Sequence, residues 1–102
     1  MALVTKLKPS KGTLFTATGA AAAATGGVLL IPANAYRVGG IVSNASTSIM
    51  YYQLAPSAGI SATVNTGQIA TLGELVLPLG YTGEVWVFLS ASNGNVNGTE
   101  FV

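Results

Sequence analysis

The chain contains no cysteine, no histidine and no aspartate. The lack of cysteine excludes a stabilising disulfide bond. The lack of histidine and cysteine excludes the Ser-His-Asp and Cys-His nucleophilic arrangements and the usual zinc-binding sets. A calcium site usually needs several clustered aspartates, so none is expected. We therefore expect no metal, no cofactor and no catalytic residue.

Charge is scarce as well. Charged residues make up 7% of the 102 residues, where an ordinary soluble domain has about 25%. Half of the residues are hydrophobic and the net charge is only +1. Because low net charge promotes association, this composition favours a chain that is packed among neighbours. A secreted or surface domain with a Ser/Thr-rich exterior is the alternative.

The basic residues Lys6, Lys8, Lys11 and Arg37 all precede the first acidic residue, Glu74. This asymmetry would help a basic N-terminal arm to find an acidic face on a neighbouring copy, but three solvated lysines at a chain end are the favoured interpretation. Four basic residues are too few for the stripe with which proteins contact several phosphates, so no nucleic-acid partner is expected.

Glu74 and Glu84 were weighed as the carboxylate pair of a glycosidase. Such a pair needs a supporting polar cleft, which this sequence barely supplies, so solvated or interface carboxylates are favoured and we expect no enzyme. No stretch approaches the length of a membrane span. Lys6, Pro9 and Lys11 interrupt the N-terminal segment, so no secretory signal is expected.

The length is that of one domain. We interpret residues 1–12 as an extended N-terminal arm and residues 13–102 as a β-sandwich domain. Runs rich in β-branched and aromatic residues predict the strands. They are Thr13–Thr18, Val28–Ile31, Tyr36–Ser43, Ser48–Ala55, Ile69–Leu77, Glu84–Ser90 and Val96–Val102.

The segment Asn34–Ala55 predicts a β-hairpin, because two alternating runs flank the polar sequence Asn-Ala-Ser-Thr. Asn93-Gly94 predicts a second hairpin turn, of the type that needs positive φ. Gly73, inside a strand, suggests a bulge.

Two segments lack strand character. Gly19–Gly27 holds five alanines between glycines, and a run this short fits a loop better than a helix. Pro56–Gly67 is rich in Ser, Thr, Ala and Gly and predicts a long surface excursion, with Ile60 and Val64 as isolated anchors.

Glu84–Ser90 is the strongest strand. Trp86 and Phe88 point one way, while Val85 and Val87 point the other. Both faces are apolar, so this strand is central in a two-layer fold or has one face against a partner. Short strands with frequent turn signals and no amphipathic helix indicate an all-β fold, a single antiparallel sandwich of seven to eight strands, jelly-roll or Ig-like.

The tyrosines and the tryptophan were considered as a carbohydrate platform, because aromatic rings stack on pyranose rings. They are Tyr36, Tyr51, Tyr52, Tyr81 and Trp86, scattered through strands and a turn. Core and interface packing is therefore favoured. A glycan platform at Tyr51 and Tyr52 is the alternative.

Several stretches look familiar. They are Val28–Arg37 with its Ala-Asn-x-x-Arg step, Ile41–Asn44, Leu77–Pro78, the turn Gly80–Gly83, the strand Glu84–Leu89 and the closing Gly98–Phe101. Together they resemble a pattern in small structural proteins of tailed bacteriophages, over roughly residues 28 to 102. The chain departs from that pattern in Pro56–Gly67 and in the N-terminal arm.

The resemblance implies a virion protein with a β-sandwich fold, such as a head decoration or cement protein or part of a fibre. We expect a capsid decoration protein on the outer surface of the phage head. Its partners would be the major capsid protein and copies of itself, in a homotrimer, with no membrane. The alternative is a tail or head-fibre module that binds host surface glycans.

The expected contacts with the capsid and with neighbouring copies fall on the arm and on an outer sheet face. They are Lys6, Lys8 and Lys11 on the arm, with Ile41 and either Trp86 and Phe88 or Val85 and Val87 on the sheet.

Overall fold

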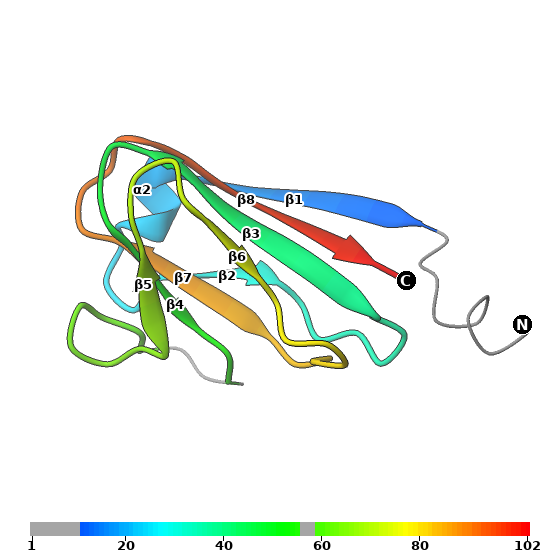
Figure 1. The fold of residues 1–102 in the computed structure, drawn as a ribbon. Helices are drawn as coiled ribbons and strands as arrows, with labels where there is room; N and C mark the ends of the chain where they lie inside the picture. Colours follow the sequence, from blue (N-terminus) through cyan, green and yellow to red (C-terminus); the bar gives the residue numbers. More distant parts are fainter. Residues whose placement is uncertain (1–10, 56–58) are drawn as a thin grey trace, which may run out of the picture.

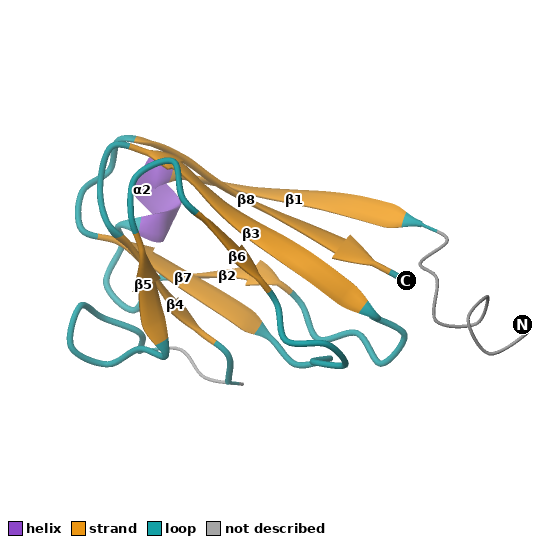
Figure 2. Ribbon diagram, in the orientation of Figure 1, coloured by secondary structure: helices purple, strands orange, loops and turns teal. Residues whose placement is uncertain are grey.

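The computed structural model describes residues 11–55 and 59–102, which contain eight strands and one short helix (Figure 2). The elements are β1 (Gly12–Thr18), α2 (Gly19–Ala22), β2 (Val28–Ile31), β3 (Gly39–Ser46), β4 (Met50–Gln53), β5 (Gly67–Ile69), β6 (Glu74–Val76), β7 (Val85–Leu89) and β8 (Gly94–Phe101). Most of the predicted arm, residues 1–10, lies outside the described residues. Gly12, which composition assigns to the arm, already belongs to β1.

The strands form two antiparallel sheets that pack face to face (Figure 1). The first sheet has the order β1-β8-β3-β6 and the second has the order β2-β7-β4-β5. Successive strands lie in different sheets, except for β4 and β5, which pair with each other. This strand order is that of a jelly roll, which folds eight antiparallel strands into two Greek keys. The predicted all-β sandwich is confirmed, and it has the jelly-roll type of the two expected.

Strand β7 shows how the sequence pattern builds the core. Val85, Val87 and Leu89 have no exposed surface, whereas Trp86 and Phe88 alternate with them and are partly exposed. The strand lies between β2 and β4 inside the second sheet, as its two apolar faces predict. The inward residues of both sheets meet in one core cluster.

The hairpin predicted over Asn34–Ala55 is wrong, although both of its strands exist. β3 pairs with β8 and β6 in the first sheet, while β4 pairs with β7 and β5 in the second. The polar link after Ser46 therefore carries the chain across the sandwich. Alternation encodes the direction in which side chains point, and it does not say which strand becomes the neighbour.

Two other turn predictions fail for the same reason. Asn93-Gly94 joins β7 to β8, which lie in different sheets, although Gly94 does have the predicted positive φ, 87°. A Cβ on Gly94 would lie 2.7 Å from the Cα of Ser46, so glycine also permits this close approach. Gly73 is no bulge: it ends the turn from β5 to β6, where Leu72 has a φ of 63°.

The alanine run begins with a helical turn, so the expectation of a loop is wrong for Gly19–Ala22. Thr18 caps this turn, its hydroxyl accepting the Ala21 N–H at 3.3 Å. In the later excursion, Ile60 is fully buried as expected, but Val64 is 58% exposed and anchors nothing.

The buried side-chain amide of Asn44 connects the loops at one end of the sandwich. The Asn44 side chain donates to the carbonyl oxygens of Ser48 at 2.8 Å and Ile69 at 3.1 Å. Its oxygen accepts from the Ser46 N–H at 3.0 Å and the Ser46 hydroxyl at 2.6 Å. The Ser48 hydroxyl donates to Asn93 Oδ1 at 2.7 Å. These bonds connect the three links that follow β3, β5 and β7.

Asn44→Ala should therefore lower the free energy of unfolding by about 2–4 kcal/mol, because it leaves several buried donors and acceptors without partners. Urea denaturation followed by the fluorescence of the single tryptophan, Trp86, measures this change. Asn95→Ala, at an exposed position of β8, is the control and should change stability by less than about 0.5 kcal/mol. Equal stability of the two variants would contradict the role of the Asn44 amide.

Candidate functional site

The part of the chain that the structure describes offers few groups that could bind a metal or a small molecule. Residues 11–55 and 59–102 hold no group of three or more His, Cys, Asp or Glu side chains that would ligate a metal, and no pocket. None of the helices in the described ranges has the length and apolar character needed to cross a membrane. The surfaces that remain to be considered are the outer faces of the two sheets.

The outer face of the second sheet carries three aromatic rings. Tyr51 lies directly opposite Phe88, and their ring centroids are 6.2 Å apart at an interplanar angle of 34°. Trp86 is two residues from Phe88 on the same strand, so it shares this face. Its indole N–H donates to Glu84 Oε1 at 3.0 Å. We call Tyr51, Trp86 and Phe88 the aromatic face.

The two tyrosines of the predicted glycan platform, Tyr51 and Tyr52, do not share a sheet face. Tyr52 follows Tyr51 on a strand, so its side chain points to the inner face and packs against the core. A Cβ on Gly67 would lie 2.6 Å from the Tyr52 hydroxyl, which shows how closely this ring covers the backbone of β5. Adjacent residues of a strand point to opposite faces, so the sequence already indicated that Tyr51 and Tyr52 would not share a face.

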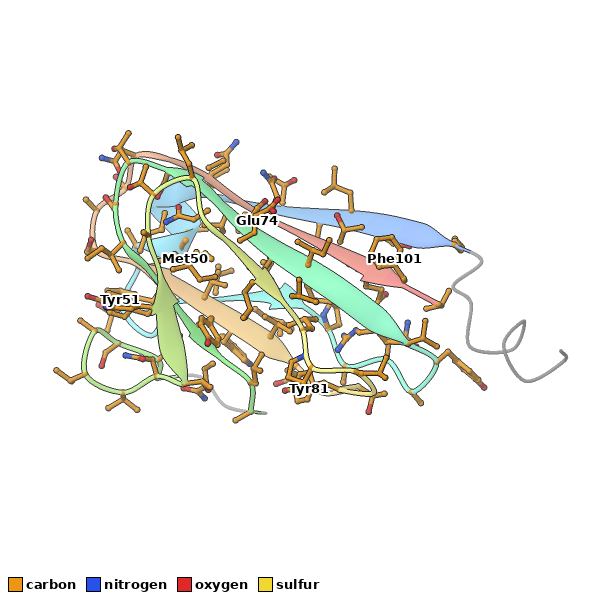
Figure 3. All side chains as sticks on the ribbon, in the orientation of Figure 1. Met50, Tyr51, Glu74, Tyr81 and Phe101 are labelled. Carbon is orange, nitrogen blue, oxygen red and sulfur yellow. The ribbon has the colours of Figure 1, made fainter. Side chains whose placement is uncertain are left out.

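The outer face of the first sheet carries an apolar row. Register places Leu14 beside Thr99, Thr99 beside Ile41, and Ile41 beside Val76. Leu14 is 67% exposed, Val76 is 72% exposed, and Ile41 is half-buried. Phe101 lies on the same face, at the end of the sandwich that holds the C-terminus (Figure 3). We call Leu14, Ile41, Val76 and Phe101 the apolar band.

The next row along the first sheet is polar. It consists of Thr16, Asn97, Ser43 and Glu74, which lie side by side across the same four strands. The apolar band thus lies toward one end of this sheet face, with Thr99 between Leu14 and Ile41 and the polar row along one side. Contiguous exposed apolar surface with a polar rim is typical of a protein interaction site.

The expected contact residues do not form one surface. Lys6 and Lys8 lie outside the described residues, and Lys11 is exposed next to β1. Ile41 belongs to the apolar band on the first sheet, whereas Trp86 and Phe88 belong to the aromatic face on the second. The alternative pair, Val85 and Val87, is buried in the core.

An ion pair buried inside the sandwich was not foreseen. Arg37 Nε donates to Glu100 Oε1 at 2.9 Å, and both residues are buried. Asn34 Nδ2 donates to the other carboxylate oxygen at 3.1 Å. The partners are 63 positions apart, so spacing gives no signal of the pair.

Arg37 also binds backbone carbonyl oxygens of its own loop and of the loop between β6 and β7. Its Nη1 donates to Tyr81 O at 3.1 Å and Gly83 O at 2.8 Å, and its Nη2 donates to Pro32 O at 2.5 Å. The fork-shaped array of donors on a guanidinium suits such multiple bonding, whereas lysine offers a point charge. Among the described residues, each buried side-chain nitrogen and oxygen has a hydrogen-bond partner.

Tyr81 belongs to the same end of the molecule (Figure 3). Its hydroxyl donates to Glu84 O at 2.6 Å. Burial raises the pKa of the Tyr81 phenol above its ordinary value, since the charged form is harder to solvate there. The positive charge of Arg37 lowers this pKa and the negative charge of Glu84 raises it, so the net shift is upward.

No family model, curated protein or solved structure matches this chain.

Arg37→Met should lower the free energy of unfolding by about 3–5 kcal/mol, because it leaves the Glu100 carboxylate buried without its cation. Lys11→Met, at an exposed cation, is the control and should cost less than about 0.5 kcal/mol. Urea denaturation of both variants makes the comparison. The double variant Arg37→Met/Glu100→Leu should lose less than the sum of the two single variants. Simple additivity would show that the two charges are not coupled.

Proposed function

We propose that this chain is a structural protein of a tailed bacteriophage virion. In this role it decorates the outer surface of the head, binds the major capsid protein in many symmetric copies and stabilises the shell. It performs no reaction. Many weak contacts add by multivalency, so that adjacent capsomers are clamped together.

The observation that carries this proposal is the apolar band on the first sheet. Leu14 and Val76 are large apolar side chains that remain mostly exposed in the isolated chain. Burial of such a side chain against a partner contributes about 1.5–3 kcal/mol. The small fraction of charged residues, 7% of the chain, also suits a subunit that is permanently part of an assembly. Fold alone would not support this function, since jelly rolls serve many roles.

Quantitative mass spectrometry of virions from the source phage tests the proposal. We expect a copy number comparable to that of the major capsid protein. In virions grown with Val76→Lys, the copy number should fall, because burying the charge removes more than about 1.4 kcal/mol of binding free energy, which lowers the affinity at least about tenfold. Thr71→Lys, in the exposed turn after β5, is the matched control and should leave the copy number unchanged.

Absence of the chain from virions would overturn the proposal. A count of a few copies or a few dozen would overturn decoration of the whole head, and would support a position at a vertex, a fibre or the tail.

The aromatic face supports a second candidate function, a fibre-associated module that binds host surface glycans. Tyr51, Phe88 and Trp86 lie on one sheet face and are partly exposed. Their rings provide flat apolar surfaces, and Gln68 lies opposite Tyr51 as a neighbouring polar side chain. Aromatic rings with adjacent hydrogen-bonding groups are the features from which sugar sites are built.

A glycan array tests this second function. If it holds, the native chain binds at least one class of host glycan, and Tyr51→Ala weakens that binding at least about tenfold. Tyr36→Ala is the matched control, because Tyr36 is 83% exposed but lies in the link between β2 and β3. If the native chain binds no glycan, or if both variants lose glycan binding equally, the aromatic face is not a glycan-binding site.

A further inference from the structure

Strand β1 lies at one edge of the first sheet. It pairs with β8 on one side and has no strand of the described residues on the other (Figure 1). Its register with β8 is unbroken over Gly12–Thr18, and the strand contains no proline and no charged residue. Proteins usually protect such edges with charges, prolines, bulges or very short strands, because a free edge pairs readily with another chain. β1 has none of these features.

The hydrogen-bond pattern identifies the groups on the free side. Lys11 and Val102 exchange both backbone hydrogen bonds, at 3.1 Å and 2.9 Å. In an antiparallel ladder such pairs alternate with pairs that do not bond to each other. The N–H and C=O groups of Thr13 and Phe15 therefore face β8, and those of Gly12, Leu14 and Thr16 face away from it.

We propose that β1 pairs with β1 of a second copy of this chain, antiparallel and about a two-fold axis at Leu14. This register is self-complementary. Leu14 lies opposite Leu14 of the second copy, and Gly12 lies opposite Thr16. Each of these pairs exchanges both of its backbone hydrogen bonds. The two first sheets then form one continuous sheet.

The other sheet edges suit this pairing less well. β5 and β6 have three residues each, and β6 begins with a charged residue, Glu74. β2 has four residues, and its register shifts between Leu29 and Ile31. Among the described strands, β1 is thus the long regular edge, and an isologous contact pairs Gly12–Thr16 of one copy with the same residues of the other.

Charge does not oppose the pairing. Lys11, which precedes β1, lies three residues from the proposed axis. The Lys11 residues of the two copies would therefore be about 20 Å apart along the strands. This distance exceeds the screening length of about 10 Å at moderate salt.

The pairing extends the apolar band as well. Leu14 ends the row that contains Ile41 and Val76, so the axis would join the rows of two copies through their leucines. The resulting unit is a dimer, in place of the trimer expected from the sequence. It concerns the purified chain and does not depend on its place in a virion.

Cysteine cross-linking tests the register, and the chain contains no native cysteine to interfere. Across the axis, the Cα atoms of Leu14 would be about 5.5 Å apart, within the range of a disulfide. Leu14→Cys should therefore form a covalent dimer under mild oxidation, seen on a non-reducing gel. Thr16→Cys is the matched control: its Cα atoms would be about 14 Å apart, so it should stay unlinked.

Light scattering after size exclusion tests the assembly. The native chain should have the mass of a dimer. Leu14→Pro should weaken dimerisation at least about tenfold, because it removes an N–H that faces the partner and spares the ladder to β8. If that variant does not fold, Leu14→Lys serves, since it sets like charges opposite each other at the axis.

A native monomer, a trimer or open-ended aggregates would overturn the inference. Cross-linking at position 16 in preference to position 14 would overturn the register. A native dimer whose stability is unchanged by Leu14→Pro or Leu14→Lys would show that another surface holds it. None of these results depends on the copy number in virions, so the pairing and the proposed function succeed or fail separately.

Discussion

The guanidinium of Arg37 lies between the two sheets and binds groups from distant parts of the chain. It pairs with Glu100 of the first sheet and with carbonyl oxygens that flank the second, at Pro32, Tyr81 and Gly83. Backbone hydrogen bonds hold strands together within a sheet. The loops that connect the two sheets of a jelly roll must be held by other interactions. Here a charge that would be costly to bury alone donates a hydrogen bond from each of its nitrogens, and it secures one end of the sandwich.

The opposite end is secured by a neutral group. Asn44 bonds to Ser46, Ser48 and Ile69, and Ser48 bonds in turn to Asn93, so that together they join three loops between the sheets. With both ends secured from inside, the strand faces stay free for contact with other molecules. One face carries the apolar band and the other the aromatic face, so the two sides of the sandwich present different surfaces.

Much of the fold was predictable because local patterns encode it. The strand Glu84–Ser90, its inward valines and its central place all follow from alternation. The neighbours of each strand did not follow, and so the hairpins at Asn34–Ala55 and Asn93-Gly94 were wrong. The candidate surfaces were predicted in part: Ile41 and Trp86 do face outwards, but on opposite sheets.

The sequence by itself determined where most strands form, which of their side chains point inwards, and that histidine and cysteine chemistry is absent. The tertiary structure alone decided the jelly-roll order, the pairing of Arg37 with Glu100, and the free edge at β1. The physical reason is how far apart in the chain the residues lie that determine each feature. Alternation is set by the geometry of adjacent residues, whereas strand order and buried ion pairs depend on contacts between residues far apart in the chain.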